Sequence, residues 1–140
     1  MSVRECRLIE LPRFDDPRGS LSFVEGGNHI PFDIARVYYI WGIPYGAERG
    51  AHGHRQLEQF LIPTSGQFDV IVDDGEDQRT FELRRPNEGL YISPMIWRDI
   101  TGFSNGAVCL ALASLPYDEA DYYRNYEDFL RDARDGMLRR

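Results

Sequence analysis

The 140-residue sequence contains no lysine, so all 16 of its basic side chains are arginine. Schiff-base catalysis is therefore excluded, because it needs an ε-amine. The two cysteines, Cys6 and Cys109, are far apart, which excludes a disulfide scaffold and a four-cysteine zinc site. No apolar run approaches the roughly 20 residues that span a bilayer, and the charged residues within 1–11 exclude a signal peptide. We therefore expect a cytoplasmic protein without membrane association.

Basic charge is also scarce, because 23 acidic side chains outnumber the 16 arginines and leave a net charge of −7. A non-specific nucleic-acid binder needs a positive field, so that class is disfavoured. Any anionic ligand must be held by a local arginine cluster. The length and the 42% hydrophobic content fit a single domain over residues 1–140.

Short β-branched and aromatic runs, separated by turn residues, dominate the chain. We expect strands near 21–25, 34–41, 57–63, 68–72, 80–83, 89–93 and 106–115. Short strands at this spacing predict an all-β sandwich or barrel. Residues 118–135 are charged with aromatics at helical spacing, which predicts a short C-terminal helical segment packed on the outside.

The residues suited to chemistry are concentrated in 46–58, with the sequence GAERGAHGHRQLE, and a glycine follows at 66. Residues two apart in a strand share a face, so we expect His52, His54 and Glu58 to point one way. In a closed barrel that face is the lumen, where imidazoles meet a small ligand. The spacing of these residues and their glycines resembles the first motif of the cupin superfamily.

Many cupins bind a divalent metal with this set and a later histidine. Residues 89–99 resemble the second cupin motif by their glycine and proline, but they contain no histidine and include Arg98. A guanidinium there opposes a metal ion. Two histidines and Glu58 would nevertheless form a facial triad, so a metal site remains an alternative.

A longer set of motifs sharpens the resemblance. In order they are DPRGSL (16–21), RVYYI (36–40), RGAHGH (49–54), LEQ (57–59), GLYI (89–92), PMIW (94–97), LAS (112–114) and YDEADY (117–122). Together they resemble the dTDP-4-keto-6-deoxyglucose 3,4-ketoisomerases. The resemblance implies a cupin-type jelly roll, a homodimer with exchanged N-terminal strands, and neither metal nor organic cofactor. It also implies a dTDP-linked keto sugar as substrate, in deoxysugar biosynthesis for a lipopolysaccharide, S-layer or antibiotic glycan.

The residues fit this chemistry. Moving a carbonyl from C4 to C3 requires removal of the C3 proton, an enediol, and protonation of C4, all of which is general acid–base work suited to histidine. The resemblance implies that His52 is the base. His54 would assist proton transfer or orient the enediol, and Tyr38 would hydrogen-bond a sugar oxygen or share the proton shuttle.

Three arginines complete the predicted site. Arg49 would hold the diphosphate, which suits a guanidinium fork, while Arg18 and Arg98 would border the sugar. In one subgroup of the family an Arg at position 18 accompanies a His at 98, and in the other a Tyr at 18 accompanies an Arg at 98. This sequence has Arg at both positions, so the C4 configuration of the product stays open.

Two other functions remain. A 3,5-epimerase shares the fold and an Arg-Gly-x-His segment, but the second histidine at 54 favours the ketoisomerase. A non-catalytic cupin module that binds a sugar or a metal is the other alternative.

Overall fold

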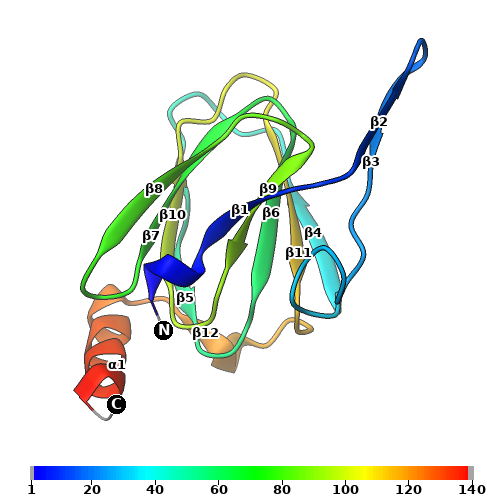
Figure 1. The fold of residues 1–140 in the computed structure, drawn as a ribbon. Helices are drawn as coiled ribbons and strands as arrows, with labels where there is room; N and C mark the ends of the chain where they lie inside the picture. The colour runs from blue at the N-terminus through cyan, green and yellow to red at the C-terminus, as the bar shows by residue number, and fades with distance from the viewer. Residues whose placement is uncertain (1, 139–140) are drawn as a thin grey trace.

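The computed structural model describes residues 2–138. Two five-stranded antiparallel sheets face each other, with strand orders β1-β9-β6-β11-β4 and β12-β5-β10-β7-β8 (Figure 1). The bounds in the first sheet are β1 Arg7–Glu10, β9 Glu88–Ile92, β6 Gln59–Ser65, β11 Val108–Ala113 and β4 Arg36–Ile40. Those in the second are β12 Tyr122–Tyr123, β5 Arg49–His54, β10 Trp97–Thr101, β7 Phe68–Asp73 and β8 Gln78–Leu83. The predicted all-β jelly roll is confirmed.

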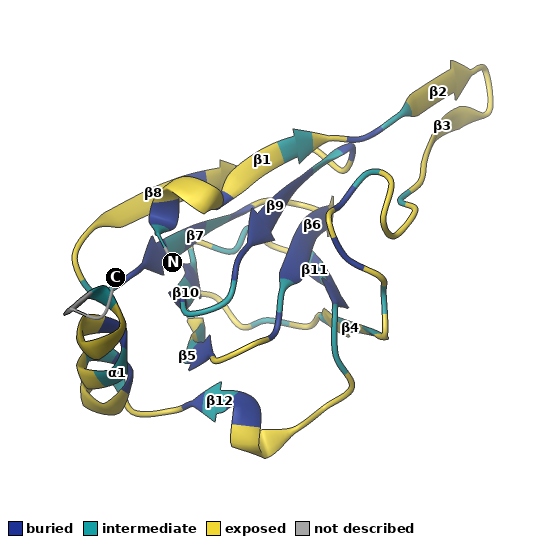
Figure 2. Ribbon diagram, turned by 60° about the horizontal axis from the view of Figure 1, so that its bottom comes forward, coloured by how far each residue is buried: buried dark blue, intermediate teal, exposed yellow. Residues whose placement is uncertain are grey.

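The space between the sheets is filled by alternate residues of facing strands. Val70 and Val72 of β7 and Leu90 and Ile92 of β9 have no exposed surface, while the residues between them are less buried or face a second cluster. A two-residue repeat produces this pattern because successive side chains of a strand point to opposite faces. Figure 2 shows the resulting buried interior.

The strands outside the expected ranges include β1 and β10. β10 carries Arg98 and Asp99, whose charge hides a strand of which three of five residues are buried. β1 is an edge strand with mostly exposed residues, so it has no apolar run to mark it. Both strands form because of tertiary pairing: β1 pairs with β9, and β10 pairs with β5 and β7.

A third sheet is a two-stranded hairpin, β2 Arg13–Asp16 and β3 Gly19–Ser22, that extends away from the two large sheets (Figure 1). All eight strand residues are exposed. Its apolar side chains Phe14 and Leu21 are 61% and 59% exposed. An isolated two-stranded hairpin is only marginally stable in water. This hairpin buries too little apolar surface within its own chain to be stable alone.

The predicted C-terminal helical segment is confirmed, although a short strand that was not expected separates its two helical pieces. Residues 119–121 form a 3-10 turn, η2, and Tyr122–Tyr123 pair with β5 as β12. The α-helix α1, Tyr126–Leu138, begins only after Asn125, whose Oδ1 accepts the backbone N–H of Asp128 at 3.1 Å. Sheet pairing of the two tyrosines therefore overrides the local helical spacing.

Helix α1 packs on the outside of β5. Phe129 is fully buried, and a Cβ at Gly53 would lie 3.1 Å from its Cδ1 atom. The strand therefore presents its glycine to the helix and its neighbouring side chains to the interior. Among residues 2–138, no helix has both the length and the apolar character to cross a membrane.

Candidate active site

A cavity of about 510 Å³ opens between β4, at the edge of one sheet, and β5 of the other. Its walls include Tyr38, Arg49, His52, Gln59, Arg98 and Tyr122. Four of the six predicted site residues are thus brought together here, namely Tyr38, Arg49, His52 and Arg98.

A β-bulge in β5 directs His52 into this cavity. His52 pairs with Arg98 and Gly50 pairs with Asp99, so Ala51 is an extra residue between them. Gly50 has φ +86°, and a Cβ there would lie 3.0 Å from the Arg98 carbonyl oxygen. A glycine is therefore required two residues before the first histidine, since a bulge re-aims the side chains that follow it.

His52 is held with one ring nitrogen free. Its Nδ1 lies 3.0 Å from the carbonyl oxygen of Gly50, and because a carbonyl only accepts, Nδ1 carries the proton. Nε2 is left with a lone pair. Burial, and then the charge of Arg98, lowers the pKa of His52 to about 4, so the ring is neutral at pH 7 and able to accept a proton.

His54 lies behind His52, fully buried and outside the cavity wall. The two rings are edge-to-face with centroids 4.9 Å apart. His54 Nδ1 donates to Asp121 Oδ2 at 3.1 Å, whereas its Nε2 is buried without a partner among residues 2–138. Burial lowers the pKa of His54 strongly, so this contact is a hydrogen bond from a neutral imidazole and not an ion pair.

Arg98, Gln59 and Tyr38 form a directed chain of hydrogen bonds. Arg98 Nη1 donates to Gln59 Oε1, and Gln59 Nε2 donates to the Tyr38 hydroxyl at 2.7 Å. Because arginine only donates, it fixes the orientation of the amide. The Tyr38 oxygen therefore accepts from Gln59 and keeps its own proton for another acceptor. Burial raises the pKa of Tyr38, so that proton is retained at neutral pH.

Arg98 itself is only 1% exposed. Its Nη2 donates to the Ile96 carbonyl at 2.9 Å, and its Nε has no partner among the described residues. Two further arginines, Arg36 and Arg124, line the cavity beside Arg49 and Arg98, against the single acidic side chain of Glu48. A chain of net charge −7 therefore concentrates positive charge at this one cavity.

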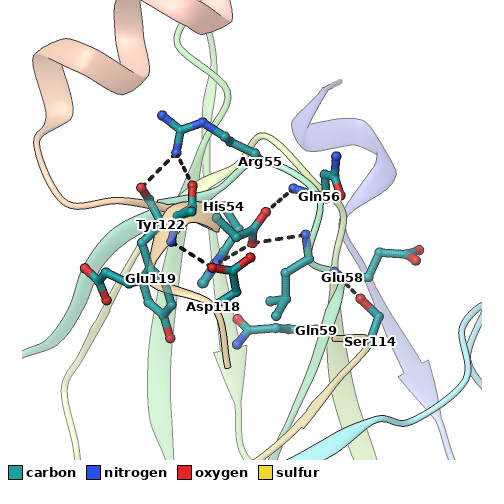
Figure 3. Close-up of polar contacts among 12 residues, drawn as sticks. His54, Arg55, Gln56, Glu58, Gln59, Ser114, Asp118, Glu119 and Tyr122 are labelled. Atoms are coloured by element: carbon teal, nitrogen blue, oxygen red, sulfur yellow. Dashed lines mark hydrogen bonds and ion pairs between the residues drawn. The ribbon is translucent and has the colours of Figure 1, made fainter. Parts of the chain in front are cut away.

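The expectation for Glu58 is wrong. Strand β5 ends at His54 and β6 begins at Gln59, so a turn breaks the two-residue alternation and Gln59 takes the inward position. Glu58 instead accepts the Tyr91 hydroxyl at 2.6 Å, and its backbone N–H donates to Ser114. Figure 3 shows its carboxylate pointing away from His54.

These residues do not fit the metal alternative. His54 Nδ1 is engaged by Asp121, Glu58 faces elsewhere, and the Arg98 charge lies next to both histidines. Within residues 2–138, no group of three or more His, Cys, Asp or Glu side chains has the geometry of a metal site.

Arg18 is not brought to the cavity of its own chain. It lies at the tip of the β2–β3 hairpin, where its side chain is 89% exposed and pairs with Asp16 at 2.8 Å.

The cavity-wall residues that sequence reasoning did not assign to the site include Arg36, Gln59, Tyr122 and Arg124. The Tyr122 ring centroid lies 4.3 Å from that of His54 and 5.3 Å from that of His52. The Arg124 guanidinium carbon lies over the same tyrosine ring, 4.2 Å from its centroid. Strand alternation from Tyr38 would have indicated Arg36, but nothing local indicates the residues of β12.

A sequence model of the family described as FdtA: WxcM-like, C-terminal, matches residues 4–134. The chain belongs to this family. A 42% identical relative from Aneurinibacillus thermoaerophilus, a TDP-4-oxo-6-deoxy-alpha-D-glucose-3,4-oxoisomerase, aligns over 125 residues, 89% of this chain and 90% of the relative. The prediction of the family and of its enzyme class, a sugar-nucleotide 3,4-ketoisomerase, is confirmed.

Solved structures agree with this FdtA-family assignment. The TDP-quinovose 3,4-ketoisomerase WlaRB of Campylobacter jejuni is 46% identical, with a TM-score of 0.87 over 91% of this chain and 98% of that one. A His-to-Asn variant of the 3,4-ketoisomerase QdtA from Thermoanaerobacterium thermosaccharolyticum, in complex with TDP-4-keto-6-deoxyglucose, is 39% identical. Its TM-score is 0.90 over 93% of this chain and 94% of that chain.

Proposed function

We propose that this protein converts dTDP-4-keto-6-deoxy-D-glucose to the dTDP-3-keto-6-deoxyhexose by proton transfer through an enediol. The observation that carries the proposal is His52, a neutral imidazole at the wall of an arginine-rich cavity with Nε2 free to accept a proton. The QdtA variant that binds TDP-4-keto-6-deoxyglucose supports the choice of substrate.

The proton movements balance within the sugar. His52 removes the C3 proton, which the adjacent ketone acidifies, and the electron pair forms the C3=C4 double bond of the enediol. Reprotonation at C4 then leaves the carbonyl at C3. One proton also moves from O3 to O4, and the Tyr38 hydroxyl, which accepts from Gln59 and retains its own proton, is suited to this shuttle.

His54 acts on the reaction through its neighbours. It is buried behind His52 and oriented by Asp121, so we assign it to positioning His52 and the Tyr122 ring. Arg49, which is exposed and lines the cavity, would hold the diphosphate. The buried Arg98 would stabilise the negative charge that develops on the sugar oxygens.

We also propose a homodimer with exchanged N-terminal strands, in which Arg18 reaches the cavity of the partner subunit. The projecting hairpin with exposed Phe14 and Leu21 supports this proposal. So does an apolar groove of about 270 Å³ on the outer face of the β1-β9-β6-β11-β4 sheet, which includes Ile62, Leu110 and Leu112. Docking of the hairpin on a second copy would bury Phe14 and Leu21, which are otherwise exposed.

The first experiment is proton NMR in deuterated buffer with dTDP-4-keto-6-deoxyglucose. A 3-keto product with deuterium at C4 supports the proposal, and its coupling pattern gives the C4 configuration. The His52→Asn variant should lose about 10²–10⁴-fold in kcat. His29→Asn is the matched control, because His29 lies outside the cavity and bonds the backbone of Glu25.

Other outcomes point to the alternatives. Exchange at C3 and C5 with the ketone still at C4 indicates a 3,5-epimerase. Absence of any exchange indicates a binding module, for which metal content is the next measurement.

The dimer is tested by mixing two inactive variants, His52→Asn and Arg18→Ala. If Arg18 acts in the partner's cavity, each mixed dimer contains one intact site, and random mixing restores about a quarter of wild-type activity. If both residues act in one chain, or if light scattering gives a monomer, mixing restores nothing.

The buried thiols Cys6 and Cys109 support a cytoplasmic location, where cysteines remain reduced. Together with a deoxysugar product, this suggests supply of a nucleotide-linked sugar for a surface or secreted glycan. Cell fractionation with an antibody against the protein tests the location.

A further inference from the structure

Arg36, on β4, is a charged side chain that the mechanism above does not use. It lines the same cavity, and its Nε and Nη2 atoms are buried without a hydrogen-bond partner among residues 2–138. Buried donors are almost always paired, because an unpaired donor loses its hydrogen bonds to water and gains none in the protein. A charged donor pair that is buried without an acceptor is therefore suited to a ligand.

The neighbours of Arg36 hold its charge but provide no acceptor. Its guanidinium carbon lies 5.5 Å from the ring centroid of Tyr38 and 5.6 Å from that of Tyr117. The Tyr38 oxygen already accepts from Gln59, and the Tyr117 hydroxyl donates to Glu119 at 2.5 Å. Two aromatic faces thus stabilise the cation and leave its N–H groups free.

Arg124 shows what the same pair of nitrogens does when an acceptor is present. Its Nε and Nη2 donate to the two carboxylate oxygens of Glu119, at 2.7 and 2.9 Å. This edge of a guanidinium matches two oxygens of a carboxylate or a phosphate. The corresponding edge of Arg36 fits the same class of group.

Strand register puts Arg36 and Arg49 at opposite ends of the cavity. Arg36 pairs with Ala113, which in turn pairs with Gln59, so Arg36 lies at the end where β5 meets Tyr122. Arg49 pairs with Ile100, at the other end of β5. His52 and Arg98 lie between the two ends.

We propose that Arg36 binds an anionic oxygen of the sugar nucleotide, at the end of the cavity opposite Arg49. The inference rests on the proposed ketoisomerase function and adds a residue to its substrate recognition. The oxygen belongs either to the diphosphate or to the enediolate formed from the sugar. Tyr117, 61% exposed, is the flanking ring with room to turn aside as the ligand enters.

The test compares Arg36→Met with the matched control Arg79→Met. Arg79, on β8, also lies over an aromatic ring, 4.6 Å from the Phe81 centroid, but it is exposed and lies outside the cavity. The midpoint of thermal unfolding is measured with and without TDP, together with the Kd for TDP, kcat and KM. Arg36→Met should leave the free protein at least as stable as wild type, since it removes two buried donors that have no acceptor.

The kinetic outcomes distinguish the two sources of the oxygen. If Arg36 binds the diphosphate, the Kd for TDP and KM rise by about tenfold or more, and kcat changes little. If it binds the enediolate, the Kd for TDP is unchanged and kcat falls by about tenfold or more. Arg36→Lys, which keeps the charge but not the paired donors, should give a smaller change of the same kind.

Three results would overturn the inference. The first is a Kd for TDP and a kcat of Arg36→Met that are both within twofold of wild type, and the second is a free Arg36→Met that is less stable than wild type but binds TDP as tightly. The third is an Arg36→Met that does not fold, together with an Arg36→Lys whose kinetics are unchanged. Turnover by the wild-type protein in the same assay separates these results from failure of the proposed function.

Discussion

Arg98 donates to the side-chain oxygen of Gln59, and no carboxylate pairs with it among residues 2–138. An arginine that is 1% exposed would ordinarily be neutralised by an acidic partner. Here the neutral amide of Gln59 accepts a hydrogen bond from Arg98 and donates one to the Tyr38 hydroxyl. The positive charge is therefore left for whatever enters the cavity.

The first prediction concerns Gln59. Replacing it with Met removes both bonds of the chain and frees the Tyr38 hydroxyl to rotate. We expect kcat to fall by about 10–100-fold, the equivalent of a hydrogen bond to a charged group, with a smaller effect on KM. Glu58→Gln is the control, because the neighbouring Glu58 bonds Tyr91 outside the cavity. Equal kcat for Gln59→Met and wild type would exclude this chain from the reaction.

The second prediction is a pH profile. The pKa of His52 is lowered to about 4, chiefly by burial, so the base stays unprotonated well below the ordinary histidine value of 6.5. We expect kcat/KM to remain level as pH decreases from 8 and to fall only below about pH 5. Half-maximal kcat/KM near pH 6.5 would contradict a buried, neutral base.

The same shift affects stability, and its sign follows from proton uptake. Between pH 6.5 and about 4 the unfolded chain protonates its histidine while folded His52 does not. His52 therefore contributes to a loss of stability as the pH falls through this window. The difference in unfolding midpoint between His52→Asn and wild type should move in favour of the variant from pH 7 to pH 4.5. A constant difference would mean that His52 has its ordinary pKa.

The third prediction concerns Asp121, whose carboxylate accepts the backbone N–H groups of Gln56 at 2.7 Å and Leu57 at 3.3 Å as well as His54 Nδ1. Asp121→Asn places an amide N–H against one of these donors. We expect about 1–3 kcal/mol of destabilisation. Nitrogen-15 NMR should show the His54 tautomer changing, because Nδ1 loses its acceptor. Asp118→Asn, at the exposed cap of η2, should change neither.

The fourth prediction tests the bulge. Gly50→Ala meets both a left-handed backbone and the Arg98 carbonyl, and should cost about 1–3 kcal/mol. Displacement of His52 should also lower kcat by about tenfold or more. Gly106→Ala has a similar φ of +74° with nothing within 4 Å, so it isolates the backbone cost. If both variants lose the same stability and Gly50→Ala keeps its kcat, the bulge does not position the base.

The sequence predicted the all-β fold and most strands because apolar and β-branched runs mark buried strands directly. It did not indicate β1, an exposed edge strand, nor β10 and β12, where pairing with β5 decides the structure and the residues are charged or aromatic. Four of the six predicted site residues line the cavity: Arg49 and His52 come from one compact motif, whereas Tyr38 and Arg98 were placed by the family resemblance. Arg36 could have been inferred from its position two residues before Tyr38, but Gln59 was missed because only the closed sandwich shows that it faces the same space as His52.

The packing of Phe129 on Gly53 limits which substitutions the sequences of β5 and α1 tolerate. Gly50 is required by the bulge, His52 and His54 by the interior, and Gly53 by a helix more than 70 positions later in the chain. Drift in the C-terminal helix is therefore not neutral for the site, although no residue of that helix borders the cavity. The strand that holds both histidines is constrained on each of its faces, and a homologue with a different helix would need a different strand.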